Sequence, residues 1–510
     1  MKNYLVINMG LKSIRVIVFD SDFEVLTSCS KPITTALNGA RVTQEPNEWI
    51  SAVDELLFKT FIDIDPKAID FVTVSASSSC LVCTDVDGNS LFEAIMVSDK
   101  RATVEAKEIE NSSYFGEVKK ETGLACDPYL MLPKILWVKK NKPNVFSKTS
   151  YFLSPNDFLI SQLTGQFVTD VFNAAKYHYS VENSSYPENL LEDLGISSKT
   201  LPQVRFPGDV VGVLKSSLCT KYGFRDDCKV VLSTYDALCA FFGSGPSEEG
   251  DACDVSGTVT SLRALSYRDP SLFKPNNVFL SRFSPFGMSV LGGSNNLGGG
   301  LIEWAKQCFY SQGEFSYEIM EEEAKSSSIG AKGLIFLPYL MGERAPLWDS
   351  NARGVLFGLE RQHTRADIIR AVFESTGYSL RNLVDSIEKS GLPVKRLLVS
   401  GGLARIGFIS QLKADITNKP VYVVDNFETT AVGAAILAMI GSGEIPSFRE
   451  ASSKLHIQTI ILPNPKNVEK YNQLYKLFGD VYYSLKDTFT ERSEVCSLLS
   501  RETTKVIENL

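Results

Sequence analysis

The sequence predicts an α/β protein built from two large domains, and three observations support this prediction. With 510 residues, the chain is longer than one ordinary hydrophobic core accommodates. Runs of strand-like composition alternate with runs of helical spacing in both halves. A strand, a glycine turn and a second strand are predicted at residues 4–20, and the same order recurs at 252–266. We therefore expect two domains that each begin with the same hairpin.

The first half begins with this hairpin, "YLVINMG" followed by "IRVIVFD". More strands and a helix follow, then a helix-rich region, and finally a strand that runs directly into a helix. By number these are strands at 23–30, 68–77 and 79–89, a helix at 46–61, the helix-rich region 101–225 and the strand–helix pair 228–245. The Gly-, Pro- and Glu-rich stretch 243–251 predicts the boundary between domains 1–245 and 246–510.

The second half repeats the alternation of strands and helices. After its opening hairpin we expect a strand at 333–340, a helix at 364–389 and a strand–turn–helix–strand unit at 395–424. A helix at 428–445 contains small residues that permit close packing, and Gly441 and Gly443 predict its end. The segment after residue 466 is predicted to be helical and to end in polar residues.

Composition excludes several classes of function. The net charge is −8, from 52 Lys and Arg against 60 Asp and Glu, which disfavours a nucleic-acid partner. No run approaches the roughly 20 apolar residues of a membrane span, so we expect a cytoplasmic protein. The ten cysteines are scattered, and Cys80 and Cys83 lie in a strand-like run where we expect core thiols rather than zinc ligands.

Glycine-bearing turns are the first candidates for a binding site. They are Gly10 with Lys12, Gly257 with Thr258, Gly401–Gly402, and the loop 291–304. Backbone N–H groups approach phosphate oxygens closely only where no side chain intervenes. Each turn alone is more often a plain turn, but several in one chain favour nucleotide binding. Neither the P-loop nor the dinucleotide-binding motif is present.

Asp236 is the acidic residue with the most suggestive setting. It follows the apolar strand "VVLSTY" and precedes the apolar run "ALCAFFG". A carboxylate in such a position could accept a proton from an alcohol, or it could simply cap a helix. The pattern alone leaves both interpretations open. The three histidines, His178, His363 and His456, are expected on the surface or at helix caps, so a histidine-dependent triad is unsupported.

Several longer motifs resemble the FGGY family of carbohydrate kinases, most nearly its xylulose kinase branch. They are "SDKRA" at 98–102, "GERAPLWDSNARGVLFGL" at 342–359, "SGGLARIGFISQLKADITNKPV" at 400–421 and "ETTAVGAAILAMIGSGE" at 428–444. The resemblance runs from about residue 3 to about residue 486. It implies two ribonuclease-H-like domains, of the actin and hexokinase type, around a central cleft.

The resemblance also implies an activity and its residues. The sugar would be held mostly by the first domain and ATP with Mg²⁺ mostly by the second, and Asp236 matches the general base that deprotonates the sugar hydroxyl. Residues that match the nucleotide site are Gly10, Lys12, Arg15, Gly257, Thr258, Gly299, Gly300, Gly401 and Gly402. Residues that match the sugar site are Ser78, Ser79, Asp99, Arg101 and Asp236. The expected partner is a small-molecule sugar, such as xylulose or a related ketose, polyol or sugar acid, and a homodimer is left open.

Departures from the family pattern support a second hypothesis. The first loop usually reads Asp-x-Gly-Thr, but here Asn8 and Leu11 replace the acid and the hydroxyl, so the metal ligand is unknown. Ser77-Ser78-Ser79 stands where xylulose kinases typically have Gln-Met-His, and Ala237 follows the predicted base. The alternative to a sugar kinase is therefore a catalytically weakened relative that binds sugar or nucleotide as a sensor or partner subunit.

Overall fold

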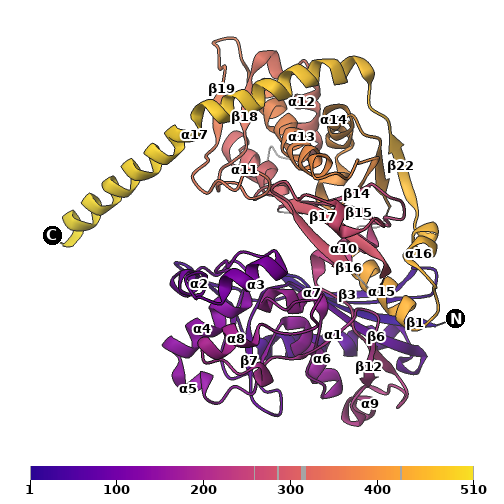
Figure 1. Ribbon diagram of the computed structural model, residues 1–510. Helices are drawn as coiled ribbons and strands as arrows, with labels where there is room; N and C mark the ends of the chain where they lie inside the picture. The colour runs from indigo at the N-terminus through magenta and orange to yellow at the C-terminus, as the bar shows by residue number, and fades with distance from the viewer. Residues whose placement is uncertain (1, 258, 284–285, 312–316, 426–427, 509–510) are drawn as a thin grey trace. The chain divides into compact units, whose positions relative to one another are not determined.

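The computed structural model describes residues 2–257, 259–283, 286–311, 317–425 and 428–508. The chain divides into two compact units (Figure 1). Unit 1 comprises Met1–Gly243 and Glu428–Lys454, and unit 2 comprises Ser244–Phe427 and Leu455–Leu510. The sequence predicts a single boundary at residue 245, with everything after it in the second domain. For residues 428–454 this assignment is wrong, because they pack with unit 1.

A six-stranded sheet forms the centre of unit 1, in the order β12-β13-β6-β1-β2-β3. Strand β1 pairs with β2 antiparallel and with β6 parallel, and β6 pairs with β13 parallel. The strands are β12 (Val210–Val213), β13 (Lys229–Val231), β6 (Ile69–Ala76), β1 (Asn3–Met9), β2 (Ser13–Phe19) and β3 (Val25–Pro32). The predicted hairpin at residues 4–20 is thus β1–β2, with its turn at Gly10.

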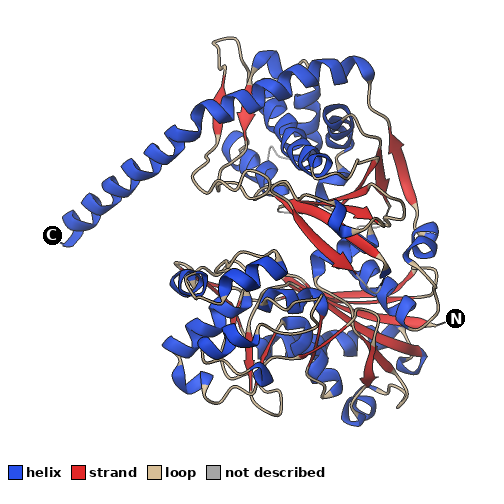
Figure 2. Cartoon of the chain, viewed as in Figure 1, coloured by secondary structure: helices blue, strands red, loops and turns tan. Residues whose placement is uncertain are grey.

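Both faces of β1 are buried, which explains why its sequence is apolar without alternation. Leu5 and Ile7 point to one face, where they join a cluster with Trp49 of α1 (Pro46–Asp63) and residues of α6 (Pro155–Thr164). Tyr4 points to the opposite face, and its hydroxyl lies 3.0 Å from the Ser442 hydroxyl, just after α15 (Thr429–Gly441). Helices therefore cover both faces of the sheet (Figure 2).

A second apolar cluster supports the helix-rich part of unit 1. Its helices are α2 (Thr103–Glu110), α3 (Phe115–Thr122), α4 (Met131–Asn141) and α8 (Glu188–Asp193). Small sheets connect this part to the central sheet: β4 (Ala36–Asn38), β5 (Arg41–Gln44) and β8 (Ala94–Ile95); β7 (Val82–Thr84) with β9 (Tyr151–Leu153); and β10 (Val168–Asp170) with β11 (Gln203–Arg205). The remaining helices of unit 1 are α5 (Pro143–Phe146), α7 (Val171–Ala174), α9 (Ser216–Tyr222), α10 (Asp236–Gly243) and α16 (Phe448–Lys454).

Unit 2 contains a seven-stranded sheet, in the order β16-β17-β15-β14-β20-β21-β22. Its strands are β16 (Phe279–Phe283), β17 (Met288–Ser294), β15 (Thr260–Ser266), β14 (Asp251–Ser256), β20 (Arg396–Ser400), β21 (Val421–Val424) and β22 (Ile457–Ile461). Strand β14 pairs with β15 antiparallel and with β20 parallel, and β20 pairs with β21 parallel. This repeats the order β3-β2-β1-β6-β13-β12 as β17-β15-β14-β20-β21-β22, so the predicted duplication of the hairpin extends to most of each sheet.

Five helices pack on or extend from the sheet of unit 2. They are α11 (Gly299–Phe309), α12 (Tyr317–Ser326), α13 (Arg365–Lys389), α14 (Gly407–Thr417) and α17 (Pro465–Glu508). Strand β18 (Ile335–Leu337) pairs antiparallel with β19 (Val355–Phe357). Helix α13 begins at a capping box between Thr364 and Asp367. The first part of α17 packs against α14 and β18, and its last part extends away from the rest of the unit (Figure 1). No helix of the described residues is long and apolar enough to cross a membrane.

Helices α10 and α15 of unit 1 cross with their backbones in contact. A Cβ atom on Gly243 would lie 1.8 Å from the carbonyl oxygen of Thr429, and one on Gly433 would lie 1.7 Å from that of Cys239. No side chain fits at either position, so the small residues of the predicted helix at 428–445 serve this crossing. The contact ties the returning segment to the helix that begins at Asp236.

We expect Gly433→Ala to lower the free energy of unfolding by about 2 kcal/mol or more, because the added methyl group forces α10 and α15 apart. Gly479→Ala is the matched control. Gly479 also lies inside a helix, but a Cβ there would have no neighbour within 4 Å. The control should be neutral or should stabilise by up to about 1 kcal/mol. Thermal and urea unfolding measure both; equal effects would contradict the crossing.

Candidate functional site

Asp236 is the first residue of α10, at the carboxyl end of β13. Its Oδ1 accepts a hydrogen bond from the backbone N–H of Ala237 at 2.7 Å, and its Oδ2 accepts one from the Ser77 hydroxyl at 2.9 Å. The side chain is half-buried. The carboxylate therefore lies at a helix start, as the capping interpretation requires, while Ser77 fixes its orientation as a general base requires. The geometry is compatible with both roles.

Ser77, Ser78 and Ser79 follow β6, the strand that lies beside β13. Of the three, Ser77 contacts Asp236, although the sequence singled out Ser78 and Ser79 for sugar binding. Ser78 is half-buried, and Ser79 is buried with a left-handed φ of 58°. Local sequence gives no signal for the Ser77 contact, because its partner lies 159 residues away. Sugar contacts of Ser78 and Ser79 stay a prediction.

Asp99 and Arg101 form a buried ion pair in the helix-rich part of unit 1. The two side chains are 0% and 3% exposed, and Arg101 Nη2 lies 2.8 Å from Asp99 Oδ2. Asp99 also accepts the backbone N–H of Val42 at 2.6 Å, and the Arg101 guanidinium lies 4.8 Å from the ring centre of Trp137. This pair fixes the 96–101 turn, and its contact with a sugar stays a prediction.

The first glycine turn joins β1 to β2, and the Gly10 N–H donates to the Ser13 carbonyl at 3.0 Å. Asn8 pairs across the sheet with Arg15 on β2 and with Ser75 on β6. Leu11 and Lys12 are exposed at the tip, and Lys12 has no ion-pair partner within the described part of the chain. Arg15 differs from Lys12, because Glu428 at the start of α15 binds its guanidinium at 2.5 Å.

Three glycine turns of unit 2 meet at the carboxyl end of β14. The N–H of Gly299 donates to the carbonyl of Gly257 at 2.7 Å, and a Cβ on Gly299 would lie 2.8 Å from that oxygen. Gly401 has a φ of 86°, and a Cβ there would lie 2.6 Å from the Ser256 carbonyl oxygen. Gly257 and Gly402 would each place a Cβ in open space. The backbones thus form a cradle with open space beside Gly257 and Gly402, which suits phosphate oxygens.

Gly300 and Thr258 also belong to the predicted nucleotide site. Gly300 lies in the first turn of α11, directly after Gly299. Thr258 lies outside the described residues, so its predicted hydroxyl contact with phosphate cannot be placed. Lys413 of α14 binds the strand that leads into the cradle. Its ammonium lies 2.5 Å from Asp254 and 3.1 Å from the Ser256 hydroxyl, and the side chains of Lys413 and Asp254 are almost fully buried.

Glu343 of the "GERAP" motif anchors the loop that leads to Gly299. Its Oε1 accepts the backbone N–H groups of Asn296 and Arg344, both at 2.8 Å. Burial raises the pKa of Glu343 to about 7, and the two N–H donors and the charge of Arg344 offset only part of this effect. The carboxyl group therefore titrates near neutral pH.

Buried acids behind Asp236 were not singled out by the sequence. Asp170, at the end of β10, accepts the Thr234 hydroxyl at 2.8 Å, two residues before Asp236. Burial raises its pKa to about 6, and burial raises that of Asp157 to about 8. Asp157 was detectable as the end of a capping box that begins at Ser154. Of the two positions expected for His178, the surface is wrong, because the side chain is 1% exposed, and the cap is confirmed, because His178 ends the short 3₁₀ turn before it in a left-handed conformation.

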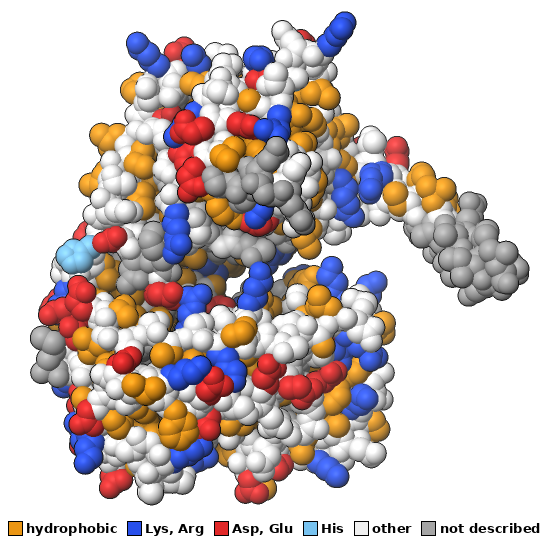
Figure 3. Space-filling model, turned by 180° about the vertical axis from the view of Figure 1, so that it is seen from behind, with side chains coloured by type: hydrophobic (Ala, Val, Ile, Leu, Met, Phe, Trp, Pro, Cys, Tyr) orange, Lys and Arg blue, Asp and Glu red, His pale blue; other side chains and the backbone are white. Residues whose placement is uncertain are grey.

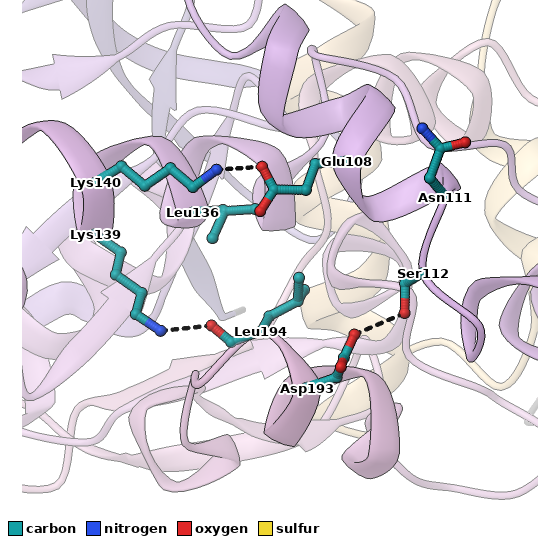
Figure 4. A pocket seen from close by; sticks show the side chains of 8 residues that line it. All are labelled: Glu108, Asn111, Ser112, Leu136, Lys139, Lys140, Asp193 and Leu194. Carbon is teal, nitrogen blue, oxygen red and sulfur yellow. Dashed lines mark hydrogen bonds and ion pairs between the residues drawn. The ribbon is translucent and has the colours of Figure 1, made fainter.

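A protein-built metal centre finds no support in the described residues, where no group of three His, Cys, Asp or Glu side chains lies close enough to hold an ion. Cys80 and Cys83 are buried, as a core role requires. One polar pocket of about 600 Å³ lies between α2, α4 and α8 (Figure 4). Lys140 pairs with Glu108, the Ser112 hydroxyl donates to Asp193, and no predicted site residue lines the pocket.

Comparison with known proteins decides the family. Residues 3–243 match the N-terminal domain of the FGGY family of carbohydrate kinases, and residues 260–442 match its C-terminal domain. The chain belongs to this family. Its recognition from sequence motifs, and the two-domain α/β fold class that the resemblance implied, are confirmed.

Individual relatives of this FGGY protein span almost its whole length. A xylulose kinase of Bacillus subtilis is 29% identical over 507 residues, covering 96% of this chain and 98% of the relative. A gluconokinase of the same organism is 25% identical over 508 residues, with 96% and 98% covered. The crystal structure of a xylulose kinase from Lactobacillus acidophilus matches with a TM-score of 0.89 at 25% identity, covering 96% of this chain and 100% of that one.

The titration of Glu343 predicts a pH-dependent stability. Because its pKa is higher in the folded protein than in the unfolded chain, the folded protein binds the extra proton between about pH 4.5 and 7. The contribution of Glu343 to the free energy of unfolding therefore falls as pH rises through this window, by about 3 kcal/mol in total.

Glu343→Gln removes this titration, so we expect the variant to match wild type near pH 4.5 and to be the more stable of the two near pH 7.5. Unfolding in urea at each pH measures the difference. Glu24→Gln, at an exposed position, serves as the control and should shift neither end. A pH-independent difference between Glu343→Gln and wild type would contradict the raised pKa.

Proposed function

We propose that this FGGY protein transfers the γ-phosphoryl group of ATP to a hydroxyl of a small sugar, with Asp236 as the general base. The setting of Asp236 carries this proposal. Its carboxylate is half-buried at a strand end, and Ser77 and Ala237 orient it with one hydrogen bond to each oxygen. A helix cap alone has no need of the bond from Ser77, which lies just after β6 and outside α10.

Phosphoryl transfer requires mainly that the protein position the reactants and stabilise their charge. The sugar hydroxyl loses its proton to Asp236, its oxygen forms a bond to the γ-phosphorus, and the bond to the bridging oxygen breaks to release ADP. Asp236 must therefore be unprotonated and fixed before transfer, which is what the two hydrogen bonds provide. Ser78, Ser79, Asp99 and Arg101 are proposed to line the sugar site in the same unit.

The nucleotide would occupy the glycine cradle of unit 2. Gly257, Gly299 and Gly401 bring their backbones together there, and Gly402 leaves room beside them. This supports binding of the phosphates by backbone N–H groups, as the resemblance implies for the family. Gly10 and Lys12 are proposed as a second phosphate contact from unit 1, since Lys12 is exposed and carries an unpaired charge within the described residues.

Mg²⁺ is proposed to arrive with ATP rather than to reside in the protein. This ion keeps several waters and is usually held by substrate phosphates with one or two carboxylates. Here the expected carboxylate is replaced by the neutral amide of Asn8. The ion would neutralise phosphate charge, and Lys12, four residues along the same turn, is placed to supply part of that neutralisation.

The substrate is proposed to be xylulose or a related ketose, polyol or sugar acid. The similarity to both xylulose kinases and gluconokinases supports this range. Serine hydroxyls at 77–79 are shorter than the Gln-Met-His that the resemblance leads one to expect, and they offer different hydrogen bonds to a sugar. A panel of xylulose, gluconate and glycerol therefore samples the three classes.

We expect ADP release from ATP and Mg²⁺ with at least one sugar of this panel, and we expect Asp236→Asn to lower kcat by about 10²- to 10⁴-fold because it removes the general base. Asp226→Asn, the same change at an exposed position, is the control and should retain full activity. Retained turnover in Asp236→Asn would remove the base assignment. A panel without turnover, together with thermal stabilisation by ATP, would instead favour the sensor or partner-subunit hypothesis.

Asn8→Asp restores the missing carboxylate, so we expect the free Mg²⁺ concentration for half-maximal activity to fall several-fold. Initial rates at saturating ATP and sugar, with Mg²⁺ varied, measure this value. Asn38→Asp adds the same charge on the exposed β4 and should leave it unchanged. An unaltered Mg²⁺ dependence in Asn8→Asp would show that the amide serves the ion as well as an acid.

A further inference from the structure

Lys134 of α4 carries an ammonium group that is completely buried. It donates to three backbone carbonyls, those of Ser79, of Met96 at 3.0 Å and of Tyr129 at 3.2 Å. Its neighbours on the helix are apolar and also buried: Leu132, Ile135 and Leu136. A methionine at position 134 would satisfy this apolar environment without burying a charge.

Burying an ammonium group costs free energy, which hydrogen bonds or an opposite charge must offset. Burial lowers the pKa of Lys134 to about 8, despite the charges that favour its protonated form. The groups that act on it are Cys80, Asp99 and Asp127, which raise the pKa, and Arg101, which lowers it. No carboxylate lies within ion-pair distance of Lys134 among the described residues, so carbonyl oxygens hold the charge.

The two carbonyls contributed by Ser79 and Met96 belong to the two segments proposed to bind sugar. Ser79 ends the segment in which Ser77 holds Asp236, and its φ of 58° is a conformation that a serine adopts only when its surroundings impose it. The Met96 carbonyl also accepts the N–H of Asp99 at 3.2 Å, at the start of the turn that Arg101 completes. One ammonium group thus joins both segments.

We infer that Lys134 is a positioning residue that sets the affinity for the sugar, by tying the Ser77–Ser79 segment to the Met96–Arg101 turn through their backbone carbonyls. It touches neither Asp236 nor the nucleotide cradle in any contact that the described residues make. The inference rests on the proposed function, because it assigns the two segments to sugar binding. Its effect is expected on the KM for sugar and not on the KM for ATP.

Lys134→Met tests the inference, since methionine keeps the length of the side chain and removes the donors. We expect the KM for the sugar substrate to rise 10- to 100-fold, with the KM for ATP unchanged and kcat within about threefold of wild type. Lys139→Met is the matched control on the same helix. Lys139 donates to the carbonyls of Leu194 and Gly195, which belong to neither of the two segments. Loss of its ammonium group should therefore leave both KM values unchanged.

The pH dependence of the KM for sugar in the wild-type protein gives a second test, which does not depend on whether a variant folds. Above about pH 8 Lys134 loses its charge and one of its three N–H donors, so the KM for sugar should rise between pH 7.5 and 9.5. Lys134→Gln keeps two donors without a titrating group, and its KM should be raised at pH 7.5 and independent of pH. A wild-type sugar KM in Lys134→Met, or a flat wild-type profile, overturns the inference.

Failure of the proposed function is recognised separately. If wild type phosphorylates no sugar of the panel, calorimetric titration with xylulose, gluconate and glycerol replaces the KM, and weaker binding by Lys134→Met than by Lys139→Met still supports the inference. If wild type turns over a sugar and Lys134→Met binds that sugar equally well, the positioning role is lost and the kinase stands. Absence of both turnover and binding overturns both.

Discussion

The contact between the backbones of α10 and α15 is the constraint on which unit 1 depends. Gly243 and Gly433 leave no room for a Cβ atom, so the two helices are held at the shortest distance that their backbones allow. Asp236 is the first residue of α10, so its position is fixed together with that of the helix. The cradle of unit 2 follows the same principle at Gly299 and Gly401. In each unit, backbones that approach one another this closely tolerate no side chain at the glycine positions.

Buried charged side chains fix the positions of several loops and strand ends. Lys413 and Asp254 support the strand that ends at Gly257, Asp99 and Arg101 fix the turn in the helix-rich part of unit 1, and Glu343 anchors the approach to Gly299. Each buried charge costs desolvation energy that an apolar residue would avoid. Stability alone favours apolar replacements, so these buried charges are better explained by the backbone positions that they fix. Elsewhere the surface has a mixed character, and acidic and basic side chains are interspersed on the face in Figure 3.

Features carried by local sequence could be predicted. The hairpin at residues 4–20 and its counterpart at 252–266 were visible because buried strands give apolar runs and tight turns need glycine. The strand–helix junction at Asp236 was visible for the same reason. The family motifs then indicated a family that the comparisons confirm.

Features that depend on distant partners could not be predicted. Ser77 is 159 residues from Asp236, and Arg15 is 413 residues from Glu428. Helix α15 is apolar on all sides, which predicts burial but does not say in which core. For this reason its place in unit 1 was missed. Lys134 was missed as well, because a charged residue within an apolar helix is visible in the sequence but the carbonyls that it binds are not.

The return of residues 428–454 to unit 1 has a consequence for how the protein is made. Unit 2 is interrupted by the same segment, so neither unit is encoded by one continuous stretch of the gene. A nascent chain that has reached residue 243 lacks α15, and the face of β1 and β6 that α15 covers stays bare while nearly two hundred more residues are translated. Unit 1 therefore completes its fold only after most of unit 2 has been synthesised. In that interval its apolar strands are available to a chaperone that binds such surfaces.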